Sequence, residues 1–404
     1  MVHIQKLLTK QLLTACPVEL LLVPKESFNS KNNLTMESSI IKYYFLVITL
    51  FFLCACKSAQ EKTVAPYPID LEQSESSWPQ PVEIKLIPLE TNDFSLINAI
   101  DKLIYHQGTY YVFDRMGKKI QLFDEQGNYL RSIAKLGQGP GEYTEPGDID
   151  VDEEGDLYIS DWNTQSILMY PNADPTRYEK IAIGKSFLDF AVCNDFIYLN
   201  NVLGEKGVEG RIAIWDKKSK QMIYWQENDF PEEIAISWDA THHLFRSGHQ
   251  LYRYARFTSS IDRLEKGKNE PFIHFLTSRI PTTETARNWL TSPMDKQLEE
   301  KMRYISDVRG CYEAGKYLYA NLASGPSIHI LLDKESGKSW HTSRIGNIPS
   351  RGAIATTGTY FVSYCTVEQQ DFKKLISVLS DPQKRTEMEK LPDDSNPVLV
   401  LFRF

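Results

Sequence analysis

Seven residues with side chains suited to binding or catalysis are predicted to follow strands or to lie in the loops after them: Asp114, Arg115, Asp161, Trp162, Asn201, Arg256 and Asn321. Aspartates and asparagines that met at one channel could serve a hydrolase or lyase, with or without a metal ion. The aromatic face of Trp162 instead suits a sugar ring. No Ser–His–Asp or Cys–His arrangement stands out, so the set predicts a ligand-binding face, with a propeller hydrolase or lyase as the alternative.

Two motifs resemble metal sites, but neither is interpreted as one. Asp150, Asp152 and Glu154 imitate a calcium loop, but Tyr158 replaces an expected carboxylate and no helices flank the segment. A solvated strand face is the simpler interpretation. His242 and His243 are adjacent, and neighbouring strand residues point to opposite faces, so the pair cannot chelate one ion. No metal or other cofactor is predicted.

The elements that would position the candidate residues repeat along the chain. An aromatic strand, preceded by a turn signal, recurs as YYVFD, LYISD, IYLNN, LYRYA, LYANL and YFVSY, at 110–114, 157–161, 197–201, 251–255, 318–322 and 360–364. A third and a fourth strand follow most copies. Four strands repeated at roughly 40–50 residues are the sequence signature of a β-propeller blade. Six copies predict an all-β, six-bladed propeller.

The ends of the chain provide a second argument for a closed ring. The last copy lacks one strand after 398–404, and a spare strand is available at 82–89. A propeller must pair these two ends or leave an exposed sheet edge. An open sandwich would not explain the spare strand, so residues 82–404 are predicted to form one propeller with a shared last blade.

Strand order places the loops between second and third strands on the same side as the connections between blades. The candidate residues lie on that side, as do two predicted helical insertions at 281–305 and 367–391. Loops held by a rigid scaffold commonly carry binding sites. Trp289, with Leu290, Met294 and Leu298 at helical spacing, is interpreted as docking the first insertion onto the propeller rather than as a ligand contact.

The N-terminal region predicts export and a lipid anchor. Residues 36–56 have a positive start, an apolar stretch too short for a comfortable membrane span, and a lipobox-like end with Cys56 as the acylated residue. Residues 57–81 are polar and are predicted to be a tether. Residues 1–35 are predicted to be an over-extended N-terminus, because a signal peptide normally starts the chain.

The charge and the cysteine content of the chain limit the partners and the cross-links that we expect. The chain has 404 residues and a formal net charge of −8, which argues against nucleic acid, since phosphate binding requires a basic surface. Cys193, Cys311 and Cys365 remain after the signal segment, and each lies in or next to a predicted strand. We interpret these three as small buried residues rather than a disulfide framework.

Several segments together carry a family resemblance: the lipobox, the strand ending in LIPLE, the loop KLGQGPGEYTEPGDI at 135–149 and the terminal NPVLVLFRF. They resemble the six-bladed β-propeller lipoproteins of Bacteroidetes, relatives of the NHL-type and TolB-like propellers, over about residues 40–404. The resemblance implies an envelope location, and we expect a lipid-anchored protein, at the outer membrane, that holds an envelope protein or a glycan.

Overall fold

The computed structural model describes residues 66–404, except positions 76, 134, 201–211, 227–242 and 266–267. All of these belong to the second of the two units into which the chain divides, Thr63–Phe404. The predicted signal segment with Cys56, the preceding residues 1–35, and the candidate Asn201 lie outside the described residues.

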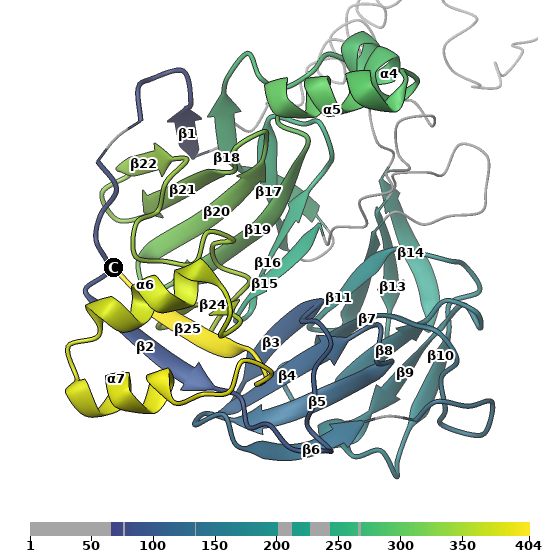
Figure 1. The fold of residues 1–404 in the computed structure, drawn as a ribbon. Helices are drawn as coiled ribbons and strands as arrows, with labels where there is room; N and C mark the ends of the chain where they lie inside the picture. The colour runs from purple at the N-terminus through teal and green to yellow at the C-terminus, as the bar shows by residue number, and fades with distance from the viewer. Residues whose placement is uncertain (1–65, 76, 134, 201–211, 227–242, 266–267) are drawn as a thin grey trace, which may run out of the picture. The chain divides into compact units, whose positions relative to one another are not determined.

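Six sheets form the described part of the chain, and the predicted six-bladed β-propeller is confirmed (Figure 1). Blades one to three contain β3 (Lys102–His106), β4 (Thr109–Asp114), β5 (Lys119–Asp124) and β6 (Tyr129–Ile133); β7 (Pro146–Val151), β8 (Leu157–Asp161), β9 (Ser166–Tyr170) and β10 (Glu179–Ala182); β11 (Asp189–Cys193), β12 (Phe196–Asn200), β13 (Ile212–Asp216) and β14 (Gln221–Gln226). Blades four to six contain β15 (Leu244–Ser247), β16 (Gln250–Tyr254), β17 (Ser260–Glu265) and β18 (Lys268–Leu276); β19 (Asp307–Ala314), β20 (Tyr317–Ala323), β21 (Ile328–Asp333) and β22 (Ser339–Thr342); β23 (Ala355–Thr356), β24 (Phe361–Cys365), β25 (Val398–Arg403) and β2 (Glu83–Pro88).

The first strand of each blade lines the centre of the ring. β3 contacts β7, and the sequence of contacts continues through β11, β15, β19 and β23 back to β3. Buried apolar clusters lie between neighbouring blades, such as the one that joins Ile120 of blade one to Ile159 of blade two. This arrangement leaves the side chains of the first strands to define whatever space remains at the axis.

The ring closes by pairing the two ends of the domain, as the sequence predicts. β2 runs antiparallel to β25 from Glu83 opposite Arg403 to Pro88 opposite Val398. The Arg403 guanidinium also lies 2.8 Å from the Glu83 carboxylate. β25 is thereby paired on both sides, with β24 and β2, and β2 is the outer strand of the last blade.

Aspartates on the first strands join neighbouring blades. Asp148 and Asp150 of β7 accept hydrogen bonds from the backbone N–H groups of Phe190 and Val192 on β11, at 3.1 and 2.6 Å. Asp189 of β11 accepts in the same way from His243 and Leu244 at the start of β15. These carboxylates satisfy backbone donors that face another sheet. The interpretation of Asp150 and Asp152 as a solvated face is wrong, since both are buried.

The predicted tether at 57–81 extends too far. β1 (Tyr67–Asp70) pairs in parallel with β18 and makes a fifth strand on blade four. Ile69 is buried in the core there, and the Trp78 ring packs edge-on against Tyr319 and Phe404. The alternation of apolar residues from Tyr67 to Leu71 is a strand pattern within a polar segment.

The two insertions are helical. α4 (Thr283–Leu290) and α5 (Met294–Arg303) connect β18 to β19, and α6 (Gln370–Val378) and α7 (Pro382–Glu389) connect β24 to β25. Trp289 is buried against Phe257 and Tyr304, which confirms its docking role. Met294 and Leu298 are instead exposed, because the helix breaks before Pro293 and the spacing does not continue across the break.

Candidate functional site

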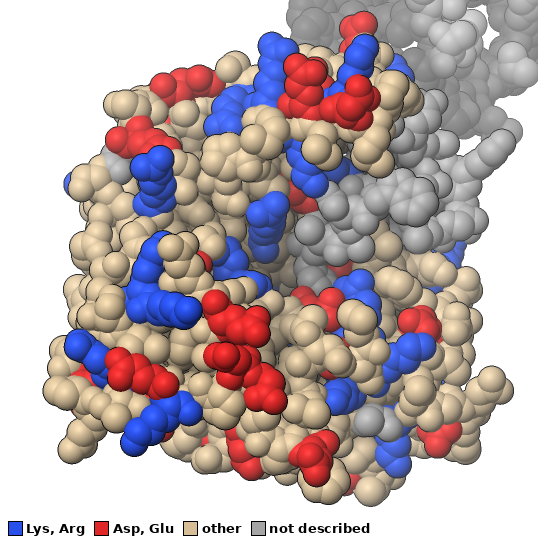
Figure 2. Space-filling view, in the orientation of Figure 1, with Lys and Arg blue, Asp and Glu red and all other residues tan. Residues whose placement is uncertain are grey.

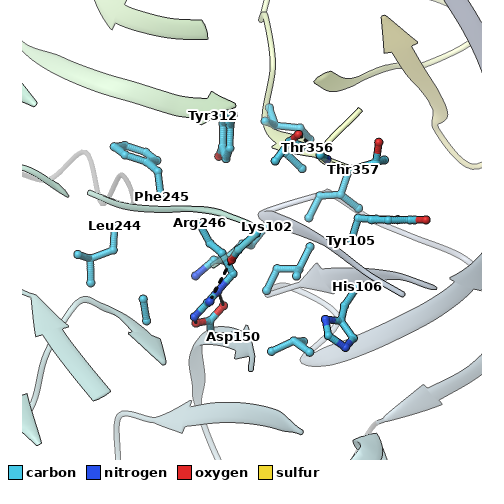
Figure 3. Close-up of a pocket in the computed structure, with 18 of the residues that line it drawn as sticks. Lys102, Tyr105, His106, Asp150, Leu244, Phe245, Arg246, Tyr312, Thr356 and Thr357 are labelled. Atoms are coloured by element: carbon cyan, nitrogen blue, oxygen red, sulfur yellow. Dashed lines mark hydrogen bonds and ion pairs between the residues drawn. The ribbon is translucent and has the colours of Figure 1, made fainter. Parts of the chain in front are cut away.

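An axial channel of about 680 Å³ runs between the first strands of the six blades. Its lining includes Lys102–His106 of β3, Asp150 of β7, Ala191 of β11, Leu244–Arg246 of β15, Arg309 and Tyr312 of β19, and Thr356 of β23. Figure 3 shows labelled side chains of five of these strands around this space. The volume falls within the range of ligand sites, roughly 300–1,000 Å³.

The two ends of the channel differ in their residues. At one end, the turns between first and second strands contribute Gln107, Glu153 and His249. At the other end, which we call the insertion mouth, lie Asp101, Arg115, Arg309, Arg351 and Tyr364. The insertion mouth is on the side of the loops between second and third strands, where the helical insertions also emerge. Figure 2 shows a hollow near the middle of the face in view, with Lys and Arg side chains on one side of it and Asp and Glu side chains on another.

An ion pair spans the channel between blades two and four. The Arg246 guanidinium donates two hydrogen bonds to Asp150, at 3.1 and 2.7 Å (Figure 3). It also lies 3.5 Å from Glu153. Burial alone would lower the pKa of Arg246, but the charge of Asp150 and the hydrogen bond to it raise that pKa overall. Ala191 of the intervening β11 also lines the channel, and its short side chain leaves room for the pair.

The candidate aspartates are held by hydrogen bonds from the loops around them. The Asp114 carboxylate is buried and accepts hydrogen bonds from the backbone N–H groups of Asn98 and Gly117 at 3.0 and 2.8 Å. Asp161 is buried as well, and it accepts from the backbone N–H groups of Thr144 and Glu145. Both side chains therefore order the loops of this face, and neither lines the channel.

Arg115 and Trp162, from blades one and two, come together at the insertion mouth. The Arg115 guanidinium lies 5.8 Å from the centre of the Trp162 ring, and Arg115 lines the channel. The indole covers Gly147 so closely that a Cβ there would lie 2.1 Å from its Nε1. A glycine is therefore required under this ring, which fixes the position of the indole beside Arg115.

The remaining candidates lie near the mouth without lining the channel. Asn321 is buried, and its Nδ2 donates to the backbone carbonyl of Arg351 at 2.8 Å. Arg256 donates to the carbonyl of Ser306 and packs against the Phe257 ring. Only Arg115 of the six described candidates contributes a side chain to the channel, and Asn321 supports another residue that does.

Two arginines of the insertion mouth were not predicted from the sequence. Arg309 is the extra residue of a β-bulge in β19, where the pairing register shifts between Val308 and Gly310, and its Nη1 donates to Ser327 Oγ at 3.0 Å. The Arg351 guanidinium stacks 3.6 Å from the centre of the Tyr364 ring. A charged residue inside the apolar strand DVRGCY was the available signal for Arg309.

Arg351 is followed by a glycine that the site requires. Gly352 has a φ of +75°, and a Cβ at this position would lie 2.0 Å from the Tyr319 hydroxyl oxygen. A larger residue is excluded by both the backbone conformation and the contact. We call Arg115, Arg309 and Arg351 the arginine arc, because blades one, five and six are consecutive around the ring.

The described part of the chain contains neither a metal-ligand cluster nor a membrane-spanning helix. No group of three or more His, Cys, Asp or Glu side chains there is arranged to hold a metal ion. His243 is instead buried in an ion pair with Asp307, with His Nε2 2.8 Å from Asp307 Oδ1. None of the helices in these residues is long and apolar enough to cross a membrane.

Fold and site together define a six-bladed β-propeller with an axial channel bordered by arginines at one mouth. Residues 81–403 match a family described as a domain of unknown function, DUF4934, and the chain belongs to that family. No curated protein matches the chain. The narrower resemblance to NHL-type and TolB-like propellers stays a prediction.

Solved structures align with this chain at low sequence identity. A Bacteroides fragilis protein described as exported aligns over 84% of this chain and 99% of its own, with 15% identity and a TM-score of 0.67. A member of the DUF4221 family from Bacteroides vulgatus aligns over 80% of this chain and 97% of its own, with 10% identity and a TM-score of 0.47. A catalytically inactive virginiamycin B lyase from Staphylococcus aureus covers 69% of this chain and 82% of its own, with 10% identity and a TM-score of 0.40.

Proposed function

We propose that this protein is a binding propeller of the cell envelope and that its axial channel takes up a glycan chain through the insertion mouth. The observation that carries the proposal is the channel itself, which is about 680 Å³ in volume and is lined by every blade. Six blades closed into a ring hold such a site in one geometry, so the protein loses little conformational entropy when a ligand binds.

The lining of the channel suits a glycan. Tyr312 and Tyr364 line it and are both partly exposed, and aromatic faces of this kind pack against sugar rings. Charged and hydroxyl side chains, such as Arg309 and the partly exposed Thr357, lie along the same space and can hydrogen-bond to sugar hydroxyls. A protein partner, the other prediction from the sequence, would instead use the outer surface of the insertions.

A catalytic role receives less support. The alternative of a hydrolase or lyase depended on carboxylates and amides meeting at the channel, with Asp114 and Asp161 among them. Both carboxylates bind backbone N–H groups of loops on this face. They support the binding face instead of supplying an acid or base to the channel.

We also propose that the protein is exported and attached to the outer membrane by a lipid on Cys56. The signal-peptide pattern at 36–56 supports this proposal, and so does the structural likeness to an exported Bacteroides protein. Metabolic labelling with an alkyne fatty acid should mark the protein in the membrane fraction and should fail for Cys56→Ser. Equal labelling of this variant, or release of the wild type without detergent, would contradict the anchor.

A channel-filling substitution tests the proposed binding site. Ile354 is partly exposed and lines the channel, so Ile354→Trp should fill part of it. Ile223 lies on β14 and is 51% exposed, which makes Ile223→Trp a matched control outside the channel. Binding of defined neutral and acidic oligosaccharides would be measured by native mass spectrometry and thermal shift.

We expect at least one oligosaccharide to bind the wild type and Ile223→Trp, but not Ile354→Trp. Binding that survives in Ile354→Trp would place the ligand elsewhere and contradict the channel proposal. The absence of binding by every oligosaccharide, together with a co-purifying protein held equally by both variants, would favour a protein partner on the outer loops.

A further inference from the structure

The charges along the channel are unevenly neutralised. Lys102 lies 3.0 Å from Asp148, and Arg246 is bound by Asp150, so the cations deeper in the channel are paired. The three members of the arginine arc, Arg115, Arg309 and Arg351, form no ion pair with a carboxylate among the described residues. Because a guanidinium stays charged at any physiological pH, the insertion mouth carries uncompensated positive charge.

Each guanidinium of the arc is held in place by a neutral neighbour. Arg351 stacks on Tyr364, and its own backbone carbonyl is held by Asn321. Arg309 is held by its hydrogen bond to the Ser327 hydroxyl. Aromatic and hydroxyl partners fix the direction of a guanidinium without neutralising it, so its remaining N–H groups stay available as donors.

Arg115 adds a donor that is both buried and unused. Its Nε is shielded from solvent and has no hydrogen-bond partner in the described part of the chain. A buried donor without an acceptor costs free energy that an incoming acceptor recovers. Its side chain lies over Trp162 at the channel wall, so an acceptor in the channel mouth is the group placed to provide that bond.

Two carboxylates near the arc are engaged elsewhere. Asp101 accepts a hydrogen bond from the backbone N–H of Arg115 at 2.8 Å, not from its guanidinium. Asp371 of α6 accepts from the backbone N–H of Ser350 at 2.8 Å and lies 3.9 Å from Lys374. These two carboxylates lower the positive electrostatic potential at the mouth, but neither forms a salt bridge with the arginines.

The charge of the arc reaches a neighbouring titratable group. His329 of β21 is 2% exposed, and burial lowers its pKa to about 4, with the positive charge of Arg309 acting in the same direction. The buried imidazole therefore responds to the charge at the mouth. An anion bound at Arg309 would offset that charge and would raise the pKa of His329.

We propose that the arginine arc binds an anionic group of the ligand, a carboxylate or a phosphate, and so selects acidic over neutral chains. This inference rests on the proposed function, because it assigns chemistry to a ligand that enters the same channel. Planar guanidinium groups donate paired hydrogen bonds to carboxylate and phosphate oxygens, which a neutral hydroxyl cannot match.

Matched probes test the proposal. Binding of trigalacturonate, neutral trigalactoside and inorganic phosphate would be measured by calorimetry with the full-length protein, so the carboxylate and phosphate sources are separated. The variants are Arg309→Gln, whose site is exposed at the bulge, and Arg115→Gln and Arg351→Gln. Arg177→Gln is the control, since Arg177 is exposed and lies outside the channel lining.

We expect trigalacturonate or phosphate to bind at least about tenfold more tightly than trigalactoside, and each arc variant to weaken the anion about tenfold or more while Arg177→Gln does not. The NMR titration of His329 should shift upward with the bound anion. Equal binding of the acidic and neutral trisaccharides, blocked by Ile354→Trp, would overturn the anion assignment and leave the channel as a glycan site. No detectable binding of either anion at 10 mM, or unchanged anion binding in all three variants, would also overturn it.

Discussion

Replacing Asp150 with asparagine should reveal how much stability depends on the ion pair that spans the channel. Asp150 is 1% exposed and accepts two hydrogen bonds from Arg246 and one from the backbone N–H of Val192. The asparagine keeps the shape and one acceptor, but removes the charge. Arg246, whose side chain is 15% exposed, would then retain only Glu153 at 3.5 Å as a counter-charge.

Removing one partner of a buried pair costs about 3–5 kcal/mol, because the other charge is left uncompensated. Glu153 remains and is 18% exposed, so the lower end, about 3 kcal/mol, is expected for Asp150→Asn. At roughly 2 °C per kcal/mol for a domain of this size, Tm should fall by about 6 °C.

Equilibrium urea unfolding followed by circular dichroism measures this cost. The control is Asp195→Asn, which removes the same charge from the exposed pair with Lys218, where little or no change is expected. A double-mutant cycle with Arg246→Met isolates the interaction of the two side chains, and its coupling free energy should show that they stabilise each other strongly. Asp150→Asn that unfolds like the control would refute the idea that Arg246 is confined between Asp150 and Glu153.

Three further predictions concern acid, the first insertion and ring closure. Burial, with the charge of Arg309, lowers the pKa of His329 to about 4, so the unfolded chain binds more protons than the folded protein between pH 6.5 and 4. The free energy of unfolding, measured in urea, should therefore fall by roughly 3 kcal/mol as the pH is lowered across that window. His329→Gln should lack this decrease. Trp289→Ala should remove about 3 kcal/mol or more from the docking of α4 and α5, seen as faster proteolysis at 283–303 with little change in global Tm. Removing residues 398–404 leaves β2 and β24 without their shared partner, and cooperative thermal unfolding should be lost.

The fold could be predicted because its signals are local and repeated. Each second strand alternates large apolar residues in period two after a turn, and the register follows from that alternation. The closing pair could be predicted because 82–89 had no other place in the repeat. β1 was missed because its apolar alternation, from Tyr67 to Leu71, is short and lies in a polar segment, and because its partner β18 is about two hundred positions away.

The site could be predicted only as a face of the molecule. Strand order places Arg115 and Trp162 on the correct side, but Asp114 and Asp161 were selected for their chemistry although backbone N–H groups of nearby loops occupy them. Arg309 was missed because a β-bulge changes which way its side chain points, and bulges break the alternation on which the prediction depends.

The distribution of charge in the channel follows from how the ring is held together. First strands of different blades share no backbone ladder, so aspartates of β7 and β11 bind the N–H groups of the next blade. A buried carboxylate also requires a counter-charge, and Lys102 and Arg246 provide it for Asp148 and Asp150. These two cations stabilise the propeller, and their ion pairs are already formed in the absence of a ligand. Anion binding at the arginine arc should therefore weaken as salt is added, while the stability conferred by the buried pairs should change little.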